Sequence, residues 1–269
     1  MTAQTIRRRN KTLIMLTVLC ALSLLAFVAT ADDKKPPAPG SPQFVAHVLD
    51  RIDDMYRGQQ SQGTMEMNIK TKHWTRSIKM ESWAMGKDYS LVRILKPKKE
   101  RGTATLKAKK NLFIYLNKTG RTIKITSGMM GGSWMGSHFT NNDLVRHNRL
   151  VDQYVTKLTF KGKKDGQEVY TLTLKAKKDA AVVWEKIEIT VRQSDLLAVS
   201  QRFYDEKGKL KRLASFSDYR ELGGKKIPCL MEMKPMDKPG EFTRVTVKKL
   251  NLSVNLSKSF FSLQKLKSM

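Results

Sequence analysis

The sequence predicts a mainly β protein, built from one antiparallel sheet of roughly 11–12 strands and two short helices. From Met65 onward, apolar residues recur at every second position, which is the spacing of a strand with one buried face. Turn residues such as Gly86-Lys87-Asp88 and Asp165-Gly166 separate these runs. Because many short strands follow one another through tight turns, we expect an antiparallel meander and not a parallel sheet.

The first 31 residues have the layout of a secretory signal peptide. A basic start precedes Leu13–Val28, an apolar stretch of 16 residues, and Ala29-Thr30-Ala31 is a cleavage motif. The apolar stretch is shorter than the roughly 20 residues that span a bilayer, which favours cleavage over a membrane anchor. We therefore expect export to the periplasm, a mature chain beginning near Asp32 and a flexible, Pro-rich leader over residues 32–42.

Residues 43–57 are predicted to form the first helix. Their apolar residues recur at spacings of three and four, and Val48 and Ile52 lie on the apolar face. The pair Ser41-Pro42 suits the helix start, and Gly58 suits its end.

The strand candidates share an alternation of apolar residues with polar or basic residues. They are Met65–Ile69, Arg76–Met85, Tyr89–Leu95, Thr103–Lys109, Asn111–Asn117, Arg121–Thr126, Val155–Lys163, Glu168–Lys175, Trp184–Arg192, Ala198–Tyr204, Lys209–Tyr219, Ile227–Met233 and Thr243–Leu252. One face of such a sheet is apolar and must be covered, either by curling of the sheet or by helices. Two short helices cover little of it, so part of this face is a candidate ligand site.

The segment Thr126–Val145 interrupts the alternation with Gly residues and large apolar residues. Its Gly residues free the backbone, and methionine side chains adapt to irregular shapes, as on surfaces that accept several ligands. A glycine-rich loop that only plugs the end of the core is the alternative. The candidate ligand-binding residues are Met129, Met130, Trp134, Met135 and Phe139 of this segment, with Val48 and Ile52 of the first helix. Thr140 and Asp143 match a capping box, which predicts the start of the second helix.

Charge and cysteine content restrict the class of partner. The net charge is +27, and removal of the four basic residues of the signal peptide leaves +23. This balance favours anionic polymers or an anionic membrane surface, while export argues against nucleic acid. Many lysines will only solvate strand edges and deter aggregation. Cleavage leaves Cys229 as the sole cysteine, so the fold cannot depend on an intramolecular disulfide.

Several motifs resemble the exported outer membrane lipoprotein-sorting protein family, whose fold is similar to that of the LolA-type periplasmic carrier. They are Gly102-Thr103-Ala104, Leu112–Leu116, the run from Ser133 to Leu144, and Phe260-Phe261. The resemblance covers nearly the whole mature chain, as a single domain over residues 43–269. It implies an incomplete, strongly curved antiparallel barrel whose concave apolar face is covered by helices. The chain departs from the family pattern at His138, where Asp is usual, and at Asn117, where Pro is usual.

The resemblance also implies a function. Such proteins carry acyl chains of lipids or lipoproteins between the inner and outer membranes. Members of the family are thought to work beside inner-membrane transporters of the resistance-nodulation-division (RND)/MMPL or ABC-permease type. The alternative is an envelope binding or scaffold protein, or a transporter subunit, that uses its basic surface and carries nothing.

An enzyme is disfavoured by the residues. His138, Asp143 and His147 could form a metal site, since His and carboxylate are metal ligands. Asp143 is already explained as a helix cap, however, and the three would need an unusual geometry to converge. No G-x-S-x-G motif is present either. The sequence therefore predicts neither catalytic residues nor a metal or other cofactor.

Overall fold

The computed structural model describes residues 37–56, 58–146, 150–178, 180 and 182–268. The predicted signal peptide and most of the predicted leader lie outside the described residues. From Pro37 onward the chain forms one compact unit. In the part of the chain that is described, no helix has both the length and the apolar character needed to cross a bilayer.

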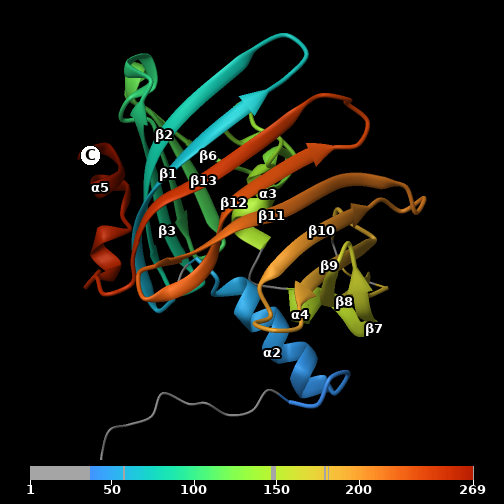
Figure 1. Ribbon diagram of the computed structural model, residues 1–269. Helices are drawn as coiled ribbons and strands as arrows, with labels where there is room; N and C mark the ends of the chain where they lie inside the picture. Colours follow the sequence, from blue (N-terminus) through green and yellow to red (C-terminus); the bar gives the residue numbers. More distant parts are fainter. Residues whose placement is uncertain (1–36, 57, 147–149, 179, 181, 269) are drawn as a thin grey trace, which may run out of the picture. The chain divides into compact units, whose positions relative to one another are not determined.

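All thirteen strands of the described chain belong to one antiparallel sheet (Figure 1). They are β1 (Gln60–Lys70), β2 (Thr75–Met85), β3 (Tyr89–Lys96), β4 (Ala104–Ala108), β5 (Asn111–Leu116), β6 (Arg121–Lys124), β7 (Tyr154–Lys164), β8 (Gln167–Ala176), β9 (Lys186–Arg192), β10 (Ala198–Tyr204), β11 (Leu210–Leu222), β12 (Lys225–Pro235) and β13 (Phe242–Asn251). Each overlaps a strand candidate, although β1 begins five residues before the candidate Met65–Ile69. The sheet has slightly more strands than the predicted 11–12 and is not closed into a barrel. The prediction of a mainly β protein with an open antiparallel sheet is confirmed.

The spatial order of the strands is β6-β5-β4-β3-β2-β1-β13-β12-β11-β10-β9-β8-β7. The first strand therefore lies in the middle of the sheet, paired with β2 on one side and the last strand on the other. The chain runs outward from β1 to the edge at β6 and returns inward from the edge at β7. The connection from β6 to β7 joins the two edges, and the Met- and Gly-rich segment is part of it.

The first helix, α2 (Pro42–Asp53), begins as predicted, because the Ser41 hydroxyl accepts a hydrogen bond from the Phe44 amide. It ends at Asp53, four residues before the predicted end. The Lys225 ammonium donates to the Asp54 carbonyl at 2.6 Å, and the Tyr56 hydroxyl donates to the Pro228 carbonyl at 2.7 Å. These tertiary contacts with β12 replace the last helical turn.

The described residues contain three further α-helices and five 3-10 helices. They are α3 (Asn141–Arg146), α4 (Leu150–Gln153), α5 (Leu263–Ser268), η1 (Lys98–Glu100), η2 (Asn117–Thr119), η3 (Ser127–Met129), η4 (Trp134–Gly136) and η5 (Lys258–Phe260). The helix at α3 was predicted from its capping box, whereas α4 and α5 were not predicted. Both are short, and neither carries a strong local signal.

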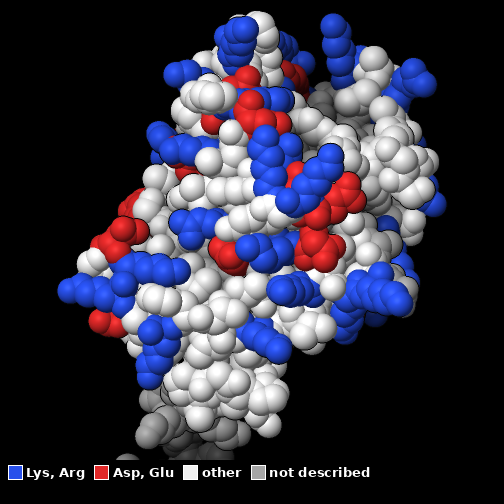
Figure 2. Space-filling view, turned by 90° about the vertical axis from the view of Figure 1, so that its right-hand side faces the viewer, with Lys and Arg blue, Asp and Glu red and all other residues white. Residues whose placement is uncertain are grey.

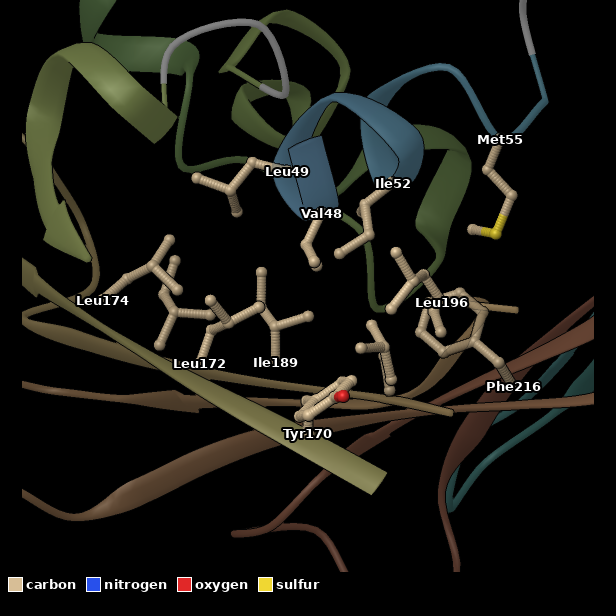
Figure 3. Close-up of a cluster of buried hydrophobic side chains, with 14 of the residues drawn as sticks. Val48, Leu49, Ile52, Met55, Tyr170, Leu172, Leu174, Ile189, Leu196 and Phe216 are labelled. Atoms are coloured by element: carbon tan, nitrogen blue, oxygen red, sulfur yellow. The ribbon is translucent and has the colours of Figure 1, made fainter. Parts of the chain in front are cut away.

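A first hydrophobic cluster lies between α2 and strands β7–β12. Figure 3 shows Val48, Leu49 and Ile52 pointing from the helix toward the side chains of the sheet. Their partners include Leu172 and Ile189, which are 0% and 1% exposed. Helix and sheet therefore bury each other's apolar faces, which is the main contribution of α2 to stability.

The other half of the sheet is covered on both faces. Ile78 and Met80 of β2 join a second cluster with Trp134, on the face that the β6–β7 connection covers. Trp83 has the opposite parity on the same strand and joins a third cluster with Phe261 and Leu266. The C-terminal residues thus cover the outer face of β2–β5, because side chains alternate between the faces of a strand.

We expect Leu266→Ala to lower the free energy of unfolding by about 2–5 kcal/mol, the usual result of truncating a fully buried Leu. Leu266 is 0% exposed, whereas Leu263 on the same helix is 42% exposed. Leu263→Ala is therefore the control and should change stability by less than about 0.5 kcal/mol. Urea unfolding of both variants measures the difference. Equal losses of stability in the two variants would contradict a structural role for the C-terminal residues that cover β2–β5.

Candidate functional site

An interior pocket of about 160 Å³ lies where the C-terminal end of α2 and the β6–β7 connection face the sheet. Most of its wall is apolar and consists of aromatic and methionine side chains. The main apolar residues are Ile52, Met55, Phe139, Phe203, Phe216, Met231 and Met233. Aromatic rings give large rigid contact surfaces, and methionines adapt to different shapes, so this wall suits an apolar ligand of variable shape.

The alternation of β10–β12 places these side chains on one face. Ala214 and Phe216 stand two residues apart in β11, and Met231 and Met233 do so in β12. Phe216 is directly opposite Met231, and Ala214 is directly opposite Met233, in the antiparallel register. Neighbouring inward positions on paired strands therefore form one continuous apolar floor.

Arg212 is the charged residue of this floor and is 7% exposed. Its guanidinium forms a bidentate ion pair with Asp143 of α3, at 2.8 and 2.9 Å, and donates to the His138 carbonyl at 3.1 Å. It also lies over the rings of Trp184 and Phe203, at 4.7 and 5.0 Å from their centroids. Arg212 therefore fixes the β6–β7 connection to the sheet through charge-assisted hydrogen bonds.

Asp143 also has the capping role predicted from the sequence. Its carboxylate accepts from the Thr140 amide at 2.7 Å, and its own amide donates to the Thr140 hydroxyl at 3.3 Å. The capping box is thereby confirmed. Because the same carboxylate also binds Arg212, the start of α3 and its attachment to β11 depend on one side chain.

His138 forms a second attachment between the connection and the sheet. Its ring contacts the Thr243 hydroxyl through Nδ1 at 2.8 Å and the Glu241 carboxylate through Nε2 at 3.0 Å. His138 and Asp143 thus have separate partners, Glu241 and Arg212, and His147 lies outside the described residues. Among the described residues, no group of three or more His, Cys, Asp or Glu side chains could hold a metal ion.

Trp134 anchors the Gly-rich part of the connection. It is 5% exposed, and its indole N–H donates to the Thr105 hydroxyl of β4 at 3.1 Å. The next two residues have left-handed backbone conformations, with φ of 51° at Met135 and 73° at Gly136. At Gly136 a side chain would be strained at this φ, so glycine allows the chain to turn back over the sheet.

The structure separates the seven predicted ligand-binding residues. Ile52 and Phe139 line the interior pocket. Val48 is fully buried in the first cluster, while Trp134 and Met135 pack in the second. Met129 is 41% exposed and Met130 is half-buried. Neither of these two methionines lines the interior pocket.

Most residues of the pocket wall were not among the ligand-binding residues predicted from the sequence. The residues concerned are Met55, Phe203, Arg212, Phe216, Met231 and Met233. Met55 follows α2, whereas the other apolar residues belong to alternating strands, and all of them resemble ordinary core residues. Arg212 carried a usable signal, because it shares the inward parity of Ala214 and Phe216, where a charged residue is unusual.

Comparison with known proteins agrees with this architecture. The model of a family described as "Uncharacterized protein" matches residues 86–268. No curated protein matches the chain. A DUF1329 family protein from Desulfovibrio piger is 24% identical, with a TM-score of 0.73, over 82% of this chain and 96% of its own. A LolA superfamily protein from Nitrosomonas europaea is 21% identical, with a TM-score of 0.68, over 82% and 98%.

A third solved structure is a Vibrio parahaemolyticus domain described as an outer membrane lipoprotein-sorting protein. It is 23% identical, with a TM-score of 0.70, and the match covers 83% of this chain and 96% of that one. Together these structures show that the chain has a LolA-like fold. The resemblance inferred from the motifs is confirmed at the level of the fold.

The Glu241 carboxylate makes part of the stability depend on pH. Its hydrogen bond with His138, and then one from the Lys72 amide, lower its pKa below the ordinary value of 4.5. A lowered folded-state pKa contributes stability above the unfolded value, and this is lost as the pH falls through the folded value. The free energy of unfolding of the Glu241→Gln variant should therefore fall less than that of the wild type when the pH is lowered from 6 to 3.

Urea unfolding midpoints at the two pH values measure this difference. Glu206→Gln, at the exposed tip of the β10–β11 hairpin, is the control and should keep the wild-type pH dependence. An equal loss of stability in the Glu241 variant and the wild type would contradict the role given to the His138–Glu241 pair.

Proposed function

Because the chain belongs to the family whose model matches residues 86–268 and has the LolA-like fold, we propose that it is a periplasmic carrier. In this proposal the acyl chains of a lipid or lipoprotein bind between the sheet and the segments that cover it. The protein then moves its cargo between the inner and outer membranes. No catalytic step is involved.

The observation that carries the proposal is an apolar pocket closed by a polar attachment. The pocket wall offers aromatic and methionine surface, which acyl chains bind at about 0.8 kcal/mol per buried CH₂ group. The cover over it is held to the sheet partly by the Arg212–Asp143 ion pair and by the contact between the His138 ring and the Glu241 carboxylate. Hydrogen bonds to water can replace such polar contacts, so the β6–β7 connection can move away while the sheet stays folded.

The size of the pocket indicates a closed state. Its volume of about 160 Å³ is below the roughly 300–1,000 Å³ usual for ligand pockets. A long acyl chain therefore requires movement of α2 or of the β6–β7 connection. In the open state, the methionines and Trp134 of the connection would turn toward the ligand, together with Ile52, Val48 and Phe139. This is the role we propose for the seven residues identified from the sequence.

The location and partners in this proposal rest on the sequence. The predicted signal peptide directs the chain to the periplasm, and an inner-membrane transporter of the RND/MMPL or ABC type would deliver or accept the cargo. The anionic membrane surface attracts basic side chains at about 1 kcal/mol each. Figure 2 shows Lys and Arg spread over one face of the protein, with Asp and Glu among them.

This basic surface supports a second candidate function. A protein that binds anionic envelope polymers or a transporter subunit through its lysines needs no vacant interior. The small pocket volume favours this alternative over a permanently open carrier. Lipid binding to the purified protein separates the two candidates.

We expect the mature protein to co-purify with lipid and to bind a fluorescent fatty acid that unlabelled palmitate displaces. Phe139→Ala and Met231→Ser should each weaken binding by about 1–3 kcal/mol, the scale of one buried apolar side chain. Met236→Ser, at a site that is 45% exposed, is the control and should bind like the wild type. Absence of lipid by mass spectrometry, together with absence of displacement, would refute the carrier function.

Binding to anionic vesicles should fall as the salt concentration rises from about 0.05 to about 0.5 M, because salt screens exposed charges. Vesicle sedimentation measures this, and neutral vesicles are the control. Binding that is independent of salt would show that apolar insertion, and not the charge of the protein, holds it at the membrane.

A further inference from the structure

A second and larger hollow lies at the other end of α2. This α2–β7 groove has a volume of about 530 Å³, within the range usual for ligand sites. Val45, Ala46 and Leu49 of α2 form one wall, and Tyr154 and Leu158 of the edge strand β7 form the other. The groove belongs entirely to the described compact unit.

A third cavity lies between the groove and the interior pocket. This cavity, of about 50 Å³, shares Tyr154 with the groove and shares Ile52 and Phe203 with the interior pocket. Three hollows therefore follow one another from the N-terminal to the C-terminal end of α2. The helix has 12 residues, so the series extends over roughly 18 Å at 1.5 Å per residue.

Tyr154 separates the groove from the small cavity. Its side chain is 5% exposed, and its hydroxyl donates to the Trp184 carbonyl at 2.9 Å. A rotation of this ring would join the two hollows and break its hydrogen bond to Trp184. Such a net loss is about 0.5–1.5 kcal/mol, which a few buried CH₂ groups of a ligand can offset.

The outer lip of the groove is amphipathic. Val151 lines it and is 56% exposed. Lys157 lines the edge of the groove, with the strand parity opposite to that of Tyr154 and Leu158, and is the one charged residue among the lining residues. A cation beside an apolar hollow matches an acyl chain that ends in an anionic group.

We infer that the α2–β7 groove is the outer part of the binding site and holds the head end of a long-chain amphiphile. The ligand has an anionic head, carboxylate or phosphate, paired with Lys157. Its acyl chain passes Tyr154 and ends in the interior pocket. This inference rests on the proposed carrier function and extends it, because the interior pocket alone is too small for a long chain.

The test uses the full mature protein and palmitate analogues with a diazirine at the last carbon or near the carboxylate. After illumination, mass spectrometry should find the terminal label on peptides containing Ile52 or Phe203. The label near the carboxylate should be found on peptides containing Tyr154 or Lys157. Both labels on the interior residues alone would overturn the inference.

Two pairs of variants give matched controls. Ala46→Trp fills the groove from an exposed helix position and should lower palmitate affinity about ten-fold or more, which corresponds to ~1.4 kcal/mol. Gln43→Trp, exposed on the same helix but outside the groove, should bind like the wild type. Lys157→Glu should weaken palmitate binding, whereas Lys161→Glu on the same strand should not. Circular dichroism checks that all four variants are folded.

The outcomes separate the two proposals. No palmitate binding by the wild type would remove the carrier function and the groove inference together. Binding that is equal in the wild type and the Ala46→Trp variant would remove the groove inference alone. Palmitate and phosphatidylglycerol are compared directly, because stronger dependence on Lys157 for one of them identifies the head group as carboxylate or phosphate.

Discussion

The pairing of the first strand with the last determines most of this architecture. β1 and β13 are antiparallel from Gln62–Asn251 to Lys70–Phe242, so both ends of the strand sequence lie in the middle of the sheet. The two edges are then β6 and β7, which are consecutive in the chain. The connection between them must cross the sheet, and the apolar face is thereby covered without a separate domain. The interior pocket, the Arg212–Asp143 ion pair and the contact of Trp134 with β4 all result from this crossing.

Buried charge gives the crossing its defined position. A guanidinium and a carboxylate away from water are unfavourable alone, and loss of one partner from a buried pair typically costs about 3–5 kcal/mol. Arg212 and Asp143 satisfy each other, and the rings of Trp184 and Phe203 add favourable contact with the cation. An apolar contact could hold the β6–β7 connection against the sheet as firmly, but it would allow the connection many positions along the strands. The ion pair selects one register and can still be replaced by water.

Local chemistry made much of the fold predictable. The alternation of apolar residues located the strands, Ser41 and Thr140 marked two helix starts, and the turn residues separated the hairpins. The pairing of β1 with β13 was not predictable in this way, because the partners are about 180 positions apart and no local pattern encodes their meeting. The pocket floor was missed for the same reason. Phe203, Phe216 and Met233 look like core residues until the segment that covers them is known.

The two halves of the sheet are supported in different ways. β2–β5 are enclosed between the cluster around Trp134 and the C-terminal residues around Phe261. On the outer face of β7–β10, polar pairs replace such a cover, including Thr171 with Thr190 and Lys186 with Glu188. The doubly covered half acts as a stiff frame, because bending it would disturb two packed layers. Strands β7–β12, which α2 covers on one face, are the more compliant part, and they carry the groove and the pocket floor. In the proposed carrier, deformation on loading would thus be concentrated where the cargo would bind, while the frame keeps its shape.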